Sequence, residues 1–250
     1  MGNLTGKVAI VTGAGRGMGQ AIAHTMAKNG ASVVLNDLDE ETVTMATSDI
    51  SKFNSEVISD VGNVSNTTYV NEMISRTLSR FNSVDILVNN AGVLRPTPII
   101  DITEEEWDFV VTGNLKTTFL CSKSVIPIMQ KRGWGRIINI SSSAGKNIST
   151  IGGAHYTAAK AAVLGFTRHM AKEVAEFGIT VNALCPGLID TEMVRSTITP
   201  QRTTEYADSF PIQRLGKPKE IADLVNFLSS EQAAYITGAS IDINGGDLMI

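Results

Sequence analysis

The chain has 250 residues, of which 43% are hydrophobic and 18% charged, and its formal net charge is −4. This length and composition suit a single α/β domain over residues 1–250 with a substantial buried core. The net negative charge and the lack of a basic run disfavour a nucleic-acid partner. No stretch approaches the roughly 20 apolar residues of a membrane-spanning helix, which disfavours a membrane partner.

Short apolar runs alternate with amphipathic stretches along the whole chain, a pattern typical of βαβ units and a parallel sheet. The runs are often β-branched, as in strands that helices cover on both faces. They predict strands at residues 8–11, 32–35, 57–59, 86–88, 136–140, 180–184 and 240–243. The stretches between them predict helices at residues 18–29, 40–48, 66–80, 103–131, 156–176 and 218–229. Thr103 suits the N-cap of the fourth helix, and Glu106 stands at its capping-box position.

Residues 190–217 are polar, contain two prolines and form the least regular part of the chain. A loop of that length inside a compact domain is usually a lid or a binding element. We therefore expect a lid there, with a plain surface loop as the alternative.

A glycine-rich turn, Thr12-Gly-Ala-Gly-Arg-Gly-Met-Gly19, follows the first predicted strand and opens the first predicted helix. Glycine lets the backbone turn tightly and approach a pyrophosphate, which then lies at the positive end of the helix. Gly13, Gly17 and Gly19 are spaced as Gly-x-x-x-Gly-x-Gly, which differs from the Gly-x-Gly-x-x-Gly fingerprint. The strand before the turn and the helix after it favour a dinucleotide site over a structural turn.

Asp37 ends the second predicted strand, at roughly the 20-residue separation expected of a ribose-binding acid. A carboxylate there accepts hydrogen bonds from the adenosine ribose and repels a 2′-phosphate, whereas Arg16 could pair with that phosphate. Because the negative charge must be overcome before Arg16 helps, we expect NAD, with NADP less favoured. The alternative is that Asp37 is only an acid at the start of the next helix.

Tyr156 and Lys160 stand one helical turn apart in a stretch predicted to be helical, so the phenol and the ammonium share one face. A cluster of serines, Ser141, Ser142 and Ser143, lies about one loop upstream. Such a Tyr–Lys pair is common by chance. With the serines and the glycine-rich turn, it indicates an enzyme that moves hydride to or from a nicotinamide cofactor.

Further motifs follow in order: Asn89-Asn-Ala-Gly92, Pro186-Gly187 and the final Thr237-Gly…Asn244-Gly-Gly246. Together with the glycine-rich turn, Ser142 and Tyr156-x-x-x-Lys160, they resemble the short-chain dehydrogenase/reductase family over nearly the whole chain. The resemblance implies a doubly wound, seven-stranded parallel sheet of Rossmann type with helices on both faces, usually assembled as a homotetramer.

The resemblance also implies a cofactor site. Its residues are Gly13, Arg16, Gly17, Met18, Gly19, Asp37, Asp60, Val61, Asn89, Ala91, Gly92, Tyr156, Lys160, Pro186, Gly187, Ile189 and Thr191. Asp60 and Val61 would hold the adenine, and Ile189 and Thr191 would contact the nicotinamide carboxamide. For the run that starts at Asn89, a turn cluster closing a strand is the structural alternative.

The resemblance further implies four catalytic residues: Asn114, Ser142, Tyr156 and Lys160. Reducing a ketone by hydride transfer creates an alkoxide, which Tyr156 can protonate if a nearby cation such as Lys160 lowers its pKa from about 10. Lys160 would also bind the nicotinamide ribose, Ser142 would hold the substrate oxygen, and Asn114 would anchor a water that relays protons. Ser143 is the alternative to Ser142, because it fits the family's commonest spacing to the tyrosine.

The sequence is most similar to the 3-oxoacyl reductase branch of that family. In that branch a basic residue that meets an acidic carrier protein often stands at the position of Phe177, and Glu173 and Glu176 would repel such a carrier. We therefore expect a small secondary alcohol or ketone as substrate, with a 3-oxoacyl thioester of a carrier protein or coenzyme A as the alternative. A non-catalytic cofactor-sensing scaffold is a remote third possibility, since fold alone does not prove catalysis.

The cysteines and histidines indicate neither a disulfide nor a metal site. Cys121 and Cys185 stand in apolar surroundings, which predicts two buried reduced thiols. His24, His155 and His169 lack ligand-like spacing with cysteines or acids, so we predict no metal site. The amino-terminal residues lack the apolar core of a secretory signal, which makes the cytoplasm the expected location.

Overall fold

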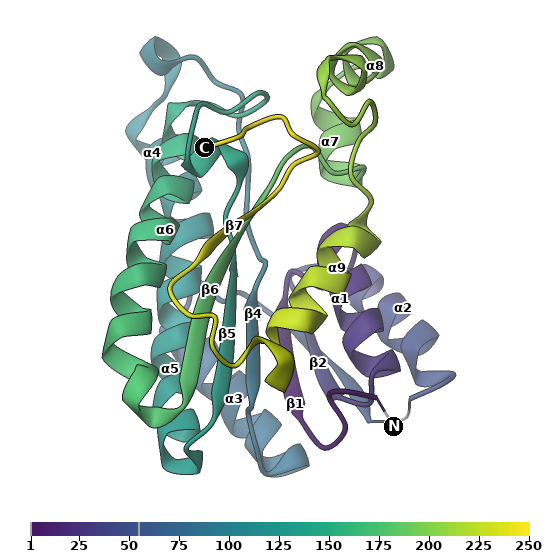
Figure 1. The fold of residues 1–250 in the computed structure, drawn as a ribbon, viewed down its shortest axis with the longest axis vertical. Coiled ribbons are helices and arrows are strands. Elements are labelled where there is room, and N and C mark those ends of the chain that lie inside the picture. Colours follow the sequence, from purple (N-terminus) through teal and green to yellow (C-terminus); the bar gives the residue numbers. More distant parts are fainter. Residues whose placement is uncertain (1, 55) are drawn as a thin grey trace.

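The computed structural model describes residues 2–54 and 56–250. Its centre is a sheet of seven strands in the order β3-β2-β1-β4-β5-β6-β7, and every pair of neighbours runs parallel (Figure 1). The strands are β1 (Val8–Thr12), β2 (Ser32–Asp37), β3 (Val57–Val61), β4 (Ile86–Asn89), β5 (Gly135–Ile140), β6 (Ile179–Pro186) and β7 (Ser240–Ile243). The predicted doubly wound sheet is confirmed.

Helices cover both faces of the sheet, because successive strand residues point to opposite sides. Ala9 and Val11 pack on one face and Ile10 on the other. The first face carries α1 (Gly17–Lys28), α2 (Glu40–Ser51) and α9 (Pro218–Leu228). The second face carries α3 (Thr67–Phe81), α5 (Thr117–Arg132) and α6 (Ala154–Val174). Within the described residues, no helix is long and apolar enough to cross a membrane.

The strand order reverses beside β1. The chain runs from β1 outward to β3, then returns to β4 on the other side of β1 and continues to β7. The connections that follow β1 and β4 therefore diverge over opposite faces of the sheet. A crevice at the carboxyl ends of the strands is the usual ligand site at such a switch point.

The single helix predicted at 103–131 is interrupted. It divides into α4 (Glu104–Val111), a π-helical turn at Thr112–Lys116 and α5. Thr103 caps α4 as predicted, accepting a hydrogen bond from the Glu106 amide at 3.2 Å. A π turn inserts an extra residue into a helix and is frequent at functional sites.

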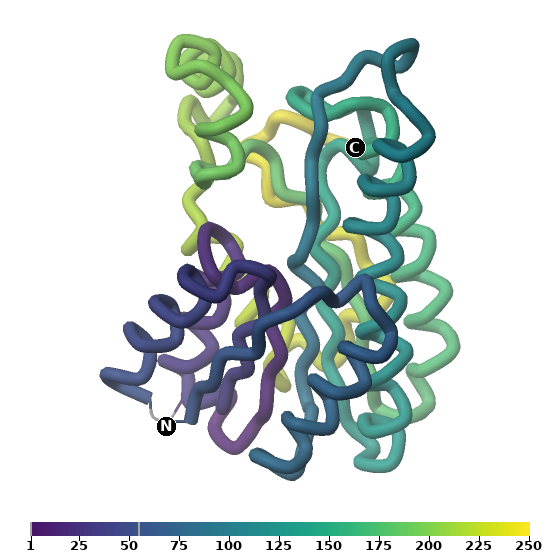
Figure 2. The backbone as a smooth tube through the Cα atoms, turned by 180° about the vertical axis from the view of Figure 1, so that it is seen from behind, coloured from purple at the N-terminus to yellow at the C-terminus, as the bar shows by residue number. Residues whose placement is uncertain are grey.

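The region predicted as a long loop, 190–217, contains two short helices, α7 (Glu192–Thr197) and α8 (Pro200–Ser209). The side chains of Thr191 and Thr199 accept hydrogen bonds at their N-caps, and Pro200 occupies the first position of α8. Figures 1 and 2, which view the molecule from opposite sides, both place these helices beyond the end of the sheet at which α6 begins. The position suits the predicted lid.

Residues 2–54 and 56–250 also contain four 3₁₀ turns: η1 (Ile99–Asp101), η3 (Ser143–Gly145), η4 (Ala175–Phe177) and η5 (Glu231–Ala233). Both cysteines are buried free thiols, as predicted. Burial raises the pKa of Cys121 to about 12 and that of Cys185 to about 11, which keeps both thiols protonated and unreactive near neutral pH.

Candidate active site

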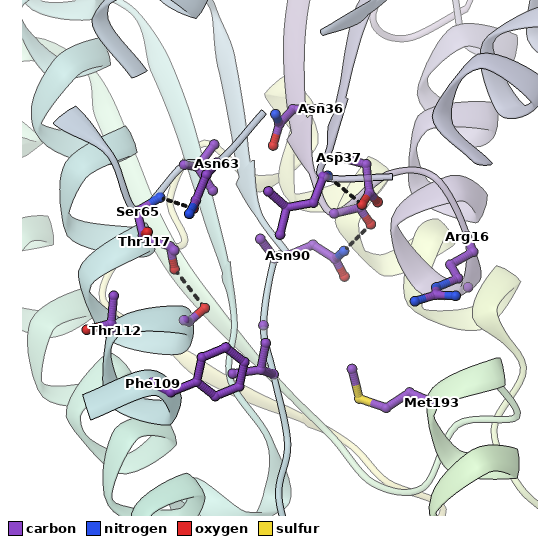
Figure 3. Close-up of a pocket in the computed structure, with 18 of the residues that line it drawn as sticks. Arg16, Asn36, Asp37, Asn63, Ser65, Asn90, Phe109, Thr112, Thr117 and Met193 are labelled. Carbon is purple, nitrogen blue, oxygen red and sulfur yellow. Dashed lines mark hydrogen bonds between the residues drawn. The ribbon is translucent and has the colours of Figure 1, made fainter. Parts of the chain in front are cut away.

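A cavity of about 520 Å³ opens at the carboxyl ends of β1, β2, β3 and β4. Its lining comes from the turns that follow these strands, from α4 and the π turn, and from the start of α7 (Figure 3). It includes Gly13, Arg16, Gly17, Met18, Asp37, Gly62, Asn63, Val64, Ser65, Asn90, Ala91, Gly92, Thr112, Thr191 and Met193. Figure 3 shows Asn63, Ser65 and Thr112 on one side of the space, and Arg16 and Met193 on the other.

The turn after β1 has a backbone that only glycine adopts readily. Gly13 and Gly17 have φ of 63° and 57°, in the left-handed region. A Cβ at Gly19 would collide with the carbonyl oxygen of Gly13, so the turn packs directly on α1. Gly17 and Met18, the first residues of α1, line the cavity, so the positive end of the helix lies at the position that suits a phosphate.

Asn90 locks the turn to β4. Its amide nitrogen donates to the carbonyl oxygens of Thr12 and Gly13 at 3.0 and 2.9 Å. The Thr12 hydroxyl in turn accepts hydrogen bonds from the amides of Asn90 and Ala91. The two sides of the crevice are thereby fixed relative to each other. Asn90 was not among the predicted site residues, although it lies inside the motif that contains them.

Asn89, which was predicted to line the cofactor, points into the protein. Its amide nitrogen donates to Asn139 on β5 at 2.8 Å and to Ser122 on α5 at 3.0 Å. Asn89 therefore joins β4 to its neighbours, whereas Asn90, Ala91 and Gly92 line the cavity.

Asp60 and Val61 are likewise placed away from the cavity, inside β3. The Asp60 carboxylate is buried and accepts two hydrogen bonds from the Arg76 guanidinium, both at 2.8 Å, and one from Tyr69. The cavity is lined instead by the next residues along the chain, Gly62 to Ser65. Asp60 and Val61 are therefore not part of the cavity lining, whereas Asn63 and Val64 are.

The catalytic candidates converge at the start of α6. Burial raises the pKa of the Tyr156 phenol, and a hydrogen bond with Ser142 opposes that rise. Ser142 and Tyr156 line the same small cavity, and so does Ser143, which begins the adjoining 3₁₀ turn. Lys160 is buried, and burial lowers its pKa to about 8. Its Nζ donates to the Ile140 carbonyl at 2.8 Å and lies 5.7 Å from the centre of the Tyr156 ring.

Asn114 lies in the π turn and is oriented by it. Its amide nitrogen donates to the carbonyls of Val93 and Val110 at 2.7 and 2.8 Å. Its Oδ1 is buried and has no hydrogen-bond partner among the described residues. A Cβ built on Gly92 would lie 2.7 Å from that Oδ1 and 3.5 Å from the Lys160 Nζ, so both atoms face the same space. An unsatisfied acceptor beside an ammonium suits an ordered water.

A smaller cavity of about 80 Å³ adjoins the larger one, and Met18, Thr191 and Met193 line both. Its other lining residues include Leu94, Ser142, Ser143, Ile151, Tyr156, Pro186, Gly187, Leu188, Ile189 and Val194. The predicted residues after β6 therefore reach the site. Apolar side chains alternate in this lining with seven hydroxyl side chains, so the cavity offers both hydrocarbon contacts and hydrogen bonds to a ligand.

Comparison with known proteins agrees with this geometry. Residues 13–247 match the sequence model of a family described as enoyl-(acyl carrier protein) reductase. The chain is 44% identical to the 3-oxoacyl-(acyl-carrier-protein) reductase FabG of Vibrio cholerae, covering 99% of this chain and 100% of the relative. It is 42% identical to the FabG of Escherichia coli, with 99% and 100% covered.

Solved structures of related proteins share the same fold. A 3-oxoacyl-(acyl-carrier protein) reductase from Brucella melitensis superposes with a TM-score of 0.94 at 33% identity, covering 99% of this chain and 93% of that one. Another from the same organism, with bound NAD, has a TM-score of 0.91 at 32% identity and covers 99% and 95%.

The fold, the site and these matches define an NAD(P)-dependent oxidoreductase that acts on an alcohol or carbonyl carbon. The chain belongs to the short-chain dehydrogenase/reductase family. The resemblance stated from the sequence is confirmed, and so is the prediction of an enzyme.

The predicted preference for NAD over NADP is wrong. The relatives are 3-oxoacyl-(acyl-carrier-protein) reductases, a class for which NADPH is typical. The structure shows why Asp37 misleads. Its carboxylate accepts hydrogen bonds from the backbone amides of Gly15 at 2.8 Å and Leu38 at 2.7 Å. Asp37 thus braces the glycine-rich turn, a structural use that explains an acid here without any role in cofactor choice.

The comparisons also favour the predicted alternative, a 3-oxoacyl thioester, over a small ketone. The argument against a carrier protein rested on Glu173, Glu176 and Phe177. These residues stand at the end of α6 and in η4, just before β6 begins. Tyr156 lies at the opposite end of the 21-residue α6, about 30 Å away at 1.5 Å per residue. Their charge therefore does not act at the entrance to this chain's site.

Proposed function

We propose that the protein reduces the 3-oxo group of an acyl thioester, carried by a carrier protein or coenzyme A, to a hydroxyl group at the expense of NADPH. The observation that carries this proposal is the meeting of two hydroxyls, from Ser142 and Tyr156, beside the buried Lys160 where the two cavities adjoin. Two hydroxyls that line one cavity suit a carbonyl oxygen, which accepts two hydrogen bonds.

The larger cavity fits a dinucleotide. The turn at Gly13 and Gly17 can hold its pyrophosphate, Asn63 and Val64 can flank its adenine, and Thr191 lies where both cavities meet. When bound, the dinucleotide would supply the hydride that adds to the carbonyl carbon.

The remaining steps fall to the chain's own residues. Ser142 holds the carbonyl oxygen, and Tyr156 gives its phenolic proton to that oxygen as the carbon–oxygen double bond becomes a single bond. Lys160, whose pKa of about 8 lies near neutrality, can hand a proton back toward the phenolate. The unpartnered Oδ1 of Asn114, as seen within the described residues, can hold the water that resupplies Lys160.

Burial alone raises the pKa of Tyr156, so proton transfer depends on positive charge close to the phenol. The ammonium of Lys160 is one such charge, and the nicotinamide ring after hydride transfer would be another. Loss of the phenol should therefore stop the reaction without disturbing cofactor binding.

The test is NADPH oxidation with acetoacetyl-coenzyme A, run on the wild type and on Tyr156→Phe. We expect turnover in the wild type and a fall of about a thousandfold or more in the variant, since general acid catalysis supplies about 10²–10⁴. NADPH binding, followed by fluorescence, should be unchanged. Failure of the wild type to reduce any 3-oxoacyl thioester would refute the proposal, and so would reduction of only the matching 2-enoyl thioester.

Homotetramer assembly, which rests on the family resemblance, stays a prediction, and so does a cytoplasmic location. Sedimentation equilibrium of the purified chain would test the tetramer directly.

A further inference from the structure

A second buried polar pair lies beside the catalytic tyrosine. His155, the residue before Tyr156, is fully buried, and its Nε2 lies 2.9 Å from Oε1 of Glu106 on α4. Glu106 stands at the capping-box position of α4, but its carboxylate reaches across to His155 instead of back to its own helix start. A hydrogen bond from Thr97 and the His155 ring hold the pKa of Glu106 below its usual value, so the group is a carboxylate near neutral pH.

The pair lies beside the contact between the start of α6 and residues 93–97, of which Val93 and Leu94 line the two cavities. The amide of Gly153 donates to the Arg95 carbonyl at 2.7 Å. A Cβ on Gly153 would lie 2.6 Å from the Thr97 carbonyl oxygen and 2.7 Å from the His155 ring, so the two segments are in close contact. Leu94, in the same segment, lines the small cavity.

The same contact reaches Asn114. The Val93 carbonyl, one residue before Leu94, accepts the 2.7 Å hydrogen bond that orients the Asn114 amide. Phe109, three residues after Glu106 on α4, lines the cofactor cavity. The pair thus lies between the Tyr156 phenol, residues 93–97 and Asn114.

A second histidine–glutamate pair on α6 shows what an ordinary surface pair looks like. His169 and Glu173 are 3.1 Å apart, one turn apart on the same helix, with side chains 75% and 64% exposed. Such pairs contribute little. His155 and Glu106 instead connect two helices through a side chain with no exposed surface. Within the described residues, the His155 Nδ1 has no partner, so Glu106 alone orients the ring.

We propose, building on the function proposed above, that His155 and Glu106 are positioning residues that hold the first turn of α6 so that the Tyr156 phenol stays aligned with Ser142. The charged groups facing the pair are Glu106 itself and Arg95, whose guanidinium lies over the Phe109 ring at 5.0 Å. The pair acts through the placement of the phenol and touches neither substrate nor cofactor.

The test compares three variants with a matched control. His155→Leu and Glu106→Ala each remove the contact, His155→Gln keeps a nitrogen donor toward Glu106, and His169→Leu removes the surface pair. We expect kcat to fall about tenfold to a hundredfold in the first two, the size of effect that a small misplacement causes. KM and the NADPH dissociation constant should change by less than about threefold, and kcat of His155→Gln should recover to within about threefold of wild type. His169→Leu should match the wild type.

A purely structural pair would give a different result. It would lower the melting temperature while leaving kcat per folded molecule unchanged, and it would not be rescued by glutamine. Either outcome overturns the proposal, as does full kcat in both His155→Leu and Glu106→Ala. If His155→Leu fails to fold, Glu106→Ala decides the matter, because Glu106 is part-exposed and alanine is favoured in a helix.

An activity-free measurement separates this inference from the proposed function. Ultraviolet titration of the phenolate, taken as the difference from Tyr156→Phe, reports Tyr156 directly. Because burial raises the pKa of Tyr156, loosening the first turn of α6 should admit water and move that pKa down toward its ordinary value in Glu106→Ala. It should stay in place in His155→Gln. This shift would support the positioning role even if the wild type reduced no thioester, and its absence would refute it.

Discussion

The two sides of the active-site crevice are built in different ways. On the cofactor side, the turn after β1 is held by hydrogen bonds that the Asn90 side chain donates to the carbonyls of Thr12 and Gly13, and by glycines with no room for a side chain. On the lid side, every residue of α8 is at least partly exposed, and its contact with the rest of the site includes a 3.3 Å hydrogen bond from Tyr206 to the Thr150 carbonyl. The first side is held by buried hydrogen bonds and close backbone packing. The second is held by exposed hydrogen bonds and one small apolar cluster, so a single substitution should have a much larger effect on the first side.

The largest effect is expected from Gly19→Ala, which breaks the cofactor side. The added methyl would collide with the Gly13 carbonyl and displace the turn from α1. We expect the NADPH dissociation constant to rise about a hundredfold, since several phosphate hydrogen bonds of about 1–3 kcal/mol each are disturbed. Fluorescence titration measures the constant, and circular dichroism checks that the protein is folded.

Gly165→Ala is the control for that change. Gly165 is also in a helix, but a Cβ there would meet only the Arg168 side chain at 3.9 Å. Alanine is favoured over glycine in a helix by about 1 kcal/mol, so this variant should bind NADPH normally and melt no lower than wild type. An equal rise of the NADPH dissociation constant in both variants would contradict the claim that close packing at Gly19 shapes the cofactor site.

Lys160→Met tests the point where the two sides meet. Burial lowers the pKa of Lys160 to about 8 from 10.5. Below pH 8 the folded protein therefore holds a buried ammonium group, which destabilises it relative to the unfolded chain. The pKa difference corresponds to roughly 3 kcal/mol at most, and the lost hydrogen bond to Ile140 offsets about 1 kcal/mol of it. We therefore expect the variant to be inactive, yet about 1–2 kcal/mol more stable than wild type at pH 7.

The sign of the pH dependence is the sharper part of that prediction. Between pH 8 and 10.5 the unfolded lysine binds more protons than the folded one, so the stability of the wild type gains on that of the variant as pH rises. The advantage of Lys160→Met should therefore shrink across that window. Denaturant unfolding of both proteins at pH 7 and pH 10 would reveal it, and a gap that widens with pH would contradict the assignment.

Arg16→Ala sharpens the cofactor side alone. Arg16 is exposed and lines the cavity beside the turn braced by Asp37. If its guanidinium pairs with the 2′-phosphate, the variant loses a charge-assisted hydrogen bond of about 1.5–3 kcal/mol. KM for NADPH should then rise about tenfold or more, while KM for NADH stays constant. Steady-state kinetics with both cofactors provide the comparison. An equal rise for both would mean that Arg16 contacts only the part that the two cofactors share.

Features that depend on local sequence could be predicted, whereas contacts between residues distant in the chain could not. The strands and the glycine-rich turn follow from local patterns, so they were identified to within a few residues. Asp60 was predicted to hold the adenine because the family resemblance implies it, whereas in the structure its carboxylate pairs with Arg76 on the following helix. Local sequence does not reveal such pairings.

Other differences have the same origin. The apolar pattern of 103–131 runs on without a break, so the π turn that orients Asn114 left no sign in it. The spacing of His155 spoke only against a metal ligand, and nothing local pointed to its partner Glu106, which is 49 residues away in sequence. The helices of the lid did leave a sign, since Thr199 before Pro200 is an N-cap followed by a favoured first residue. The polarity of the region masked it.

The smallest effect is expected on the lid side, from Tyr206→Phe. The phenol accepts a hydrogen bond from Arg202 at 3.1 Å and donates to the Thr150 carbonyl at 3.3 Å, and both partners are solvent-accessible. Exposed hydrogen bonds of this kind contribute about 0.5–1.5 kcal/mol at most. We expect KM for the acyl thioester to rise about two- to threefold, with kcat and the NADPH dissociation constant unchanged. Because Thr150 also lines the small cavity, a larger rise would show that the lid is fastened mainly by this one contact. No rise at all would mean that α8 is held in place by its apolar contacts, among them Tyr206 against the cluster of Leu188, Val194 and Phe210.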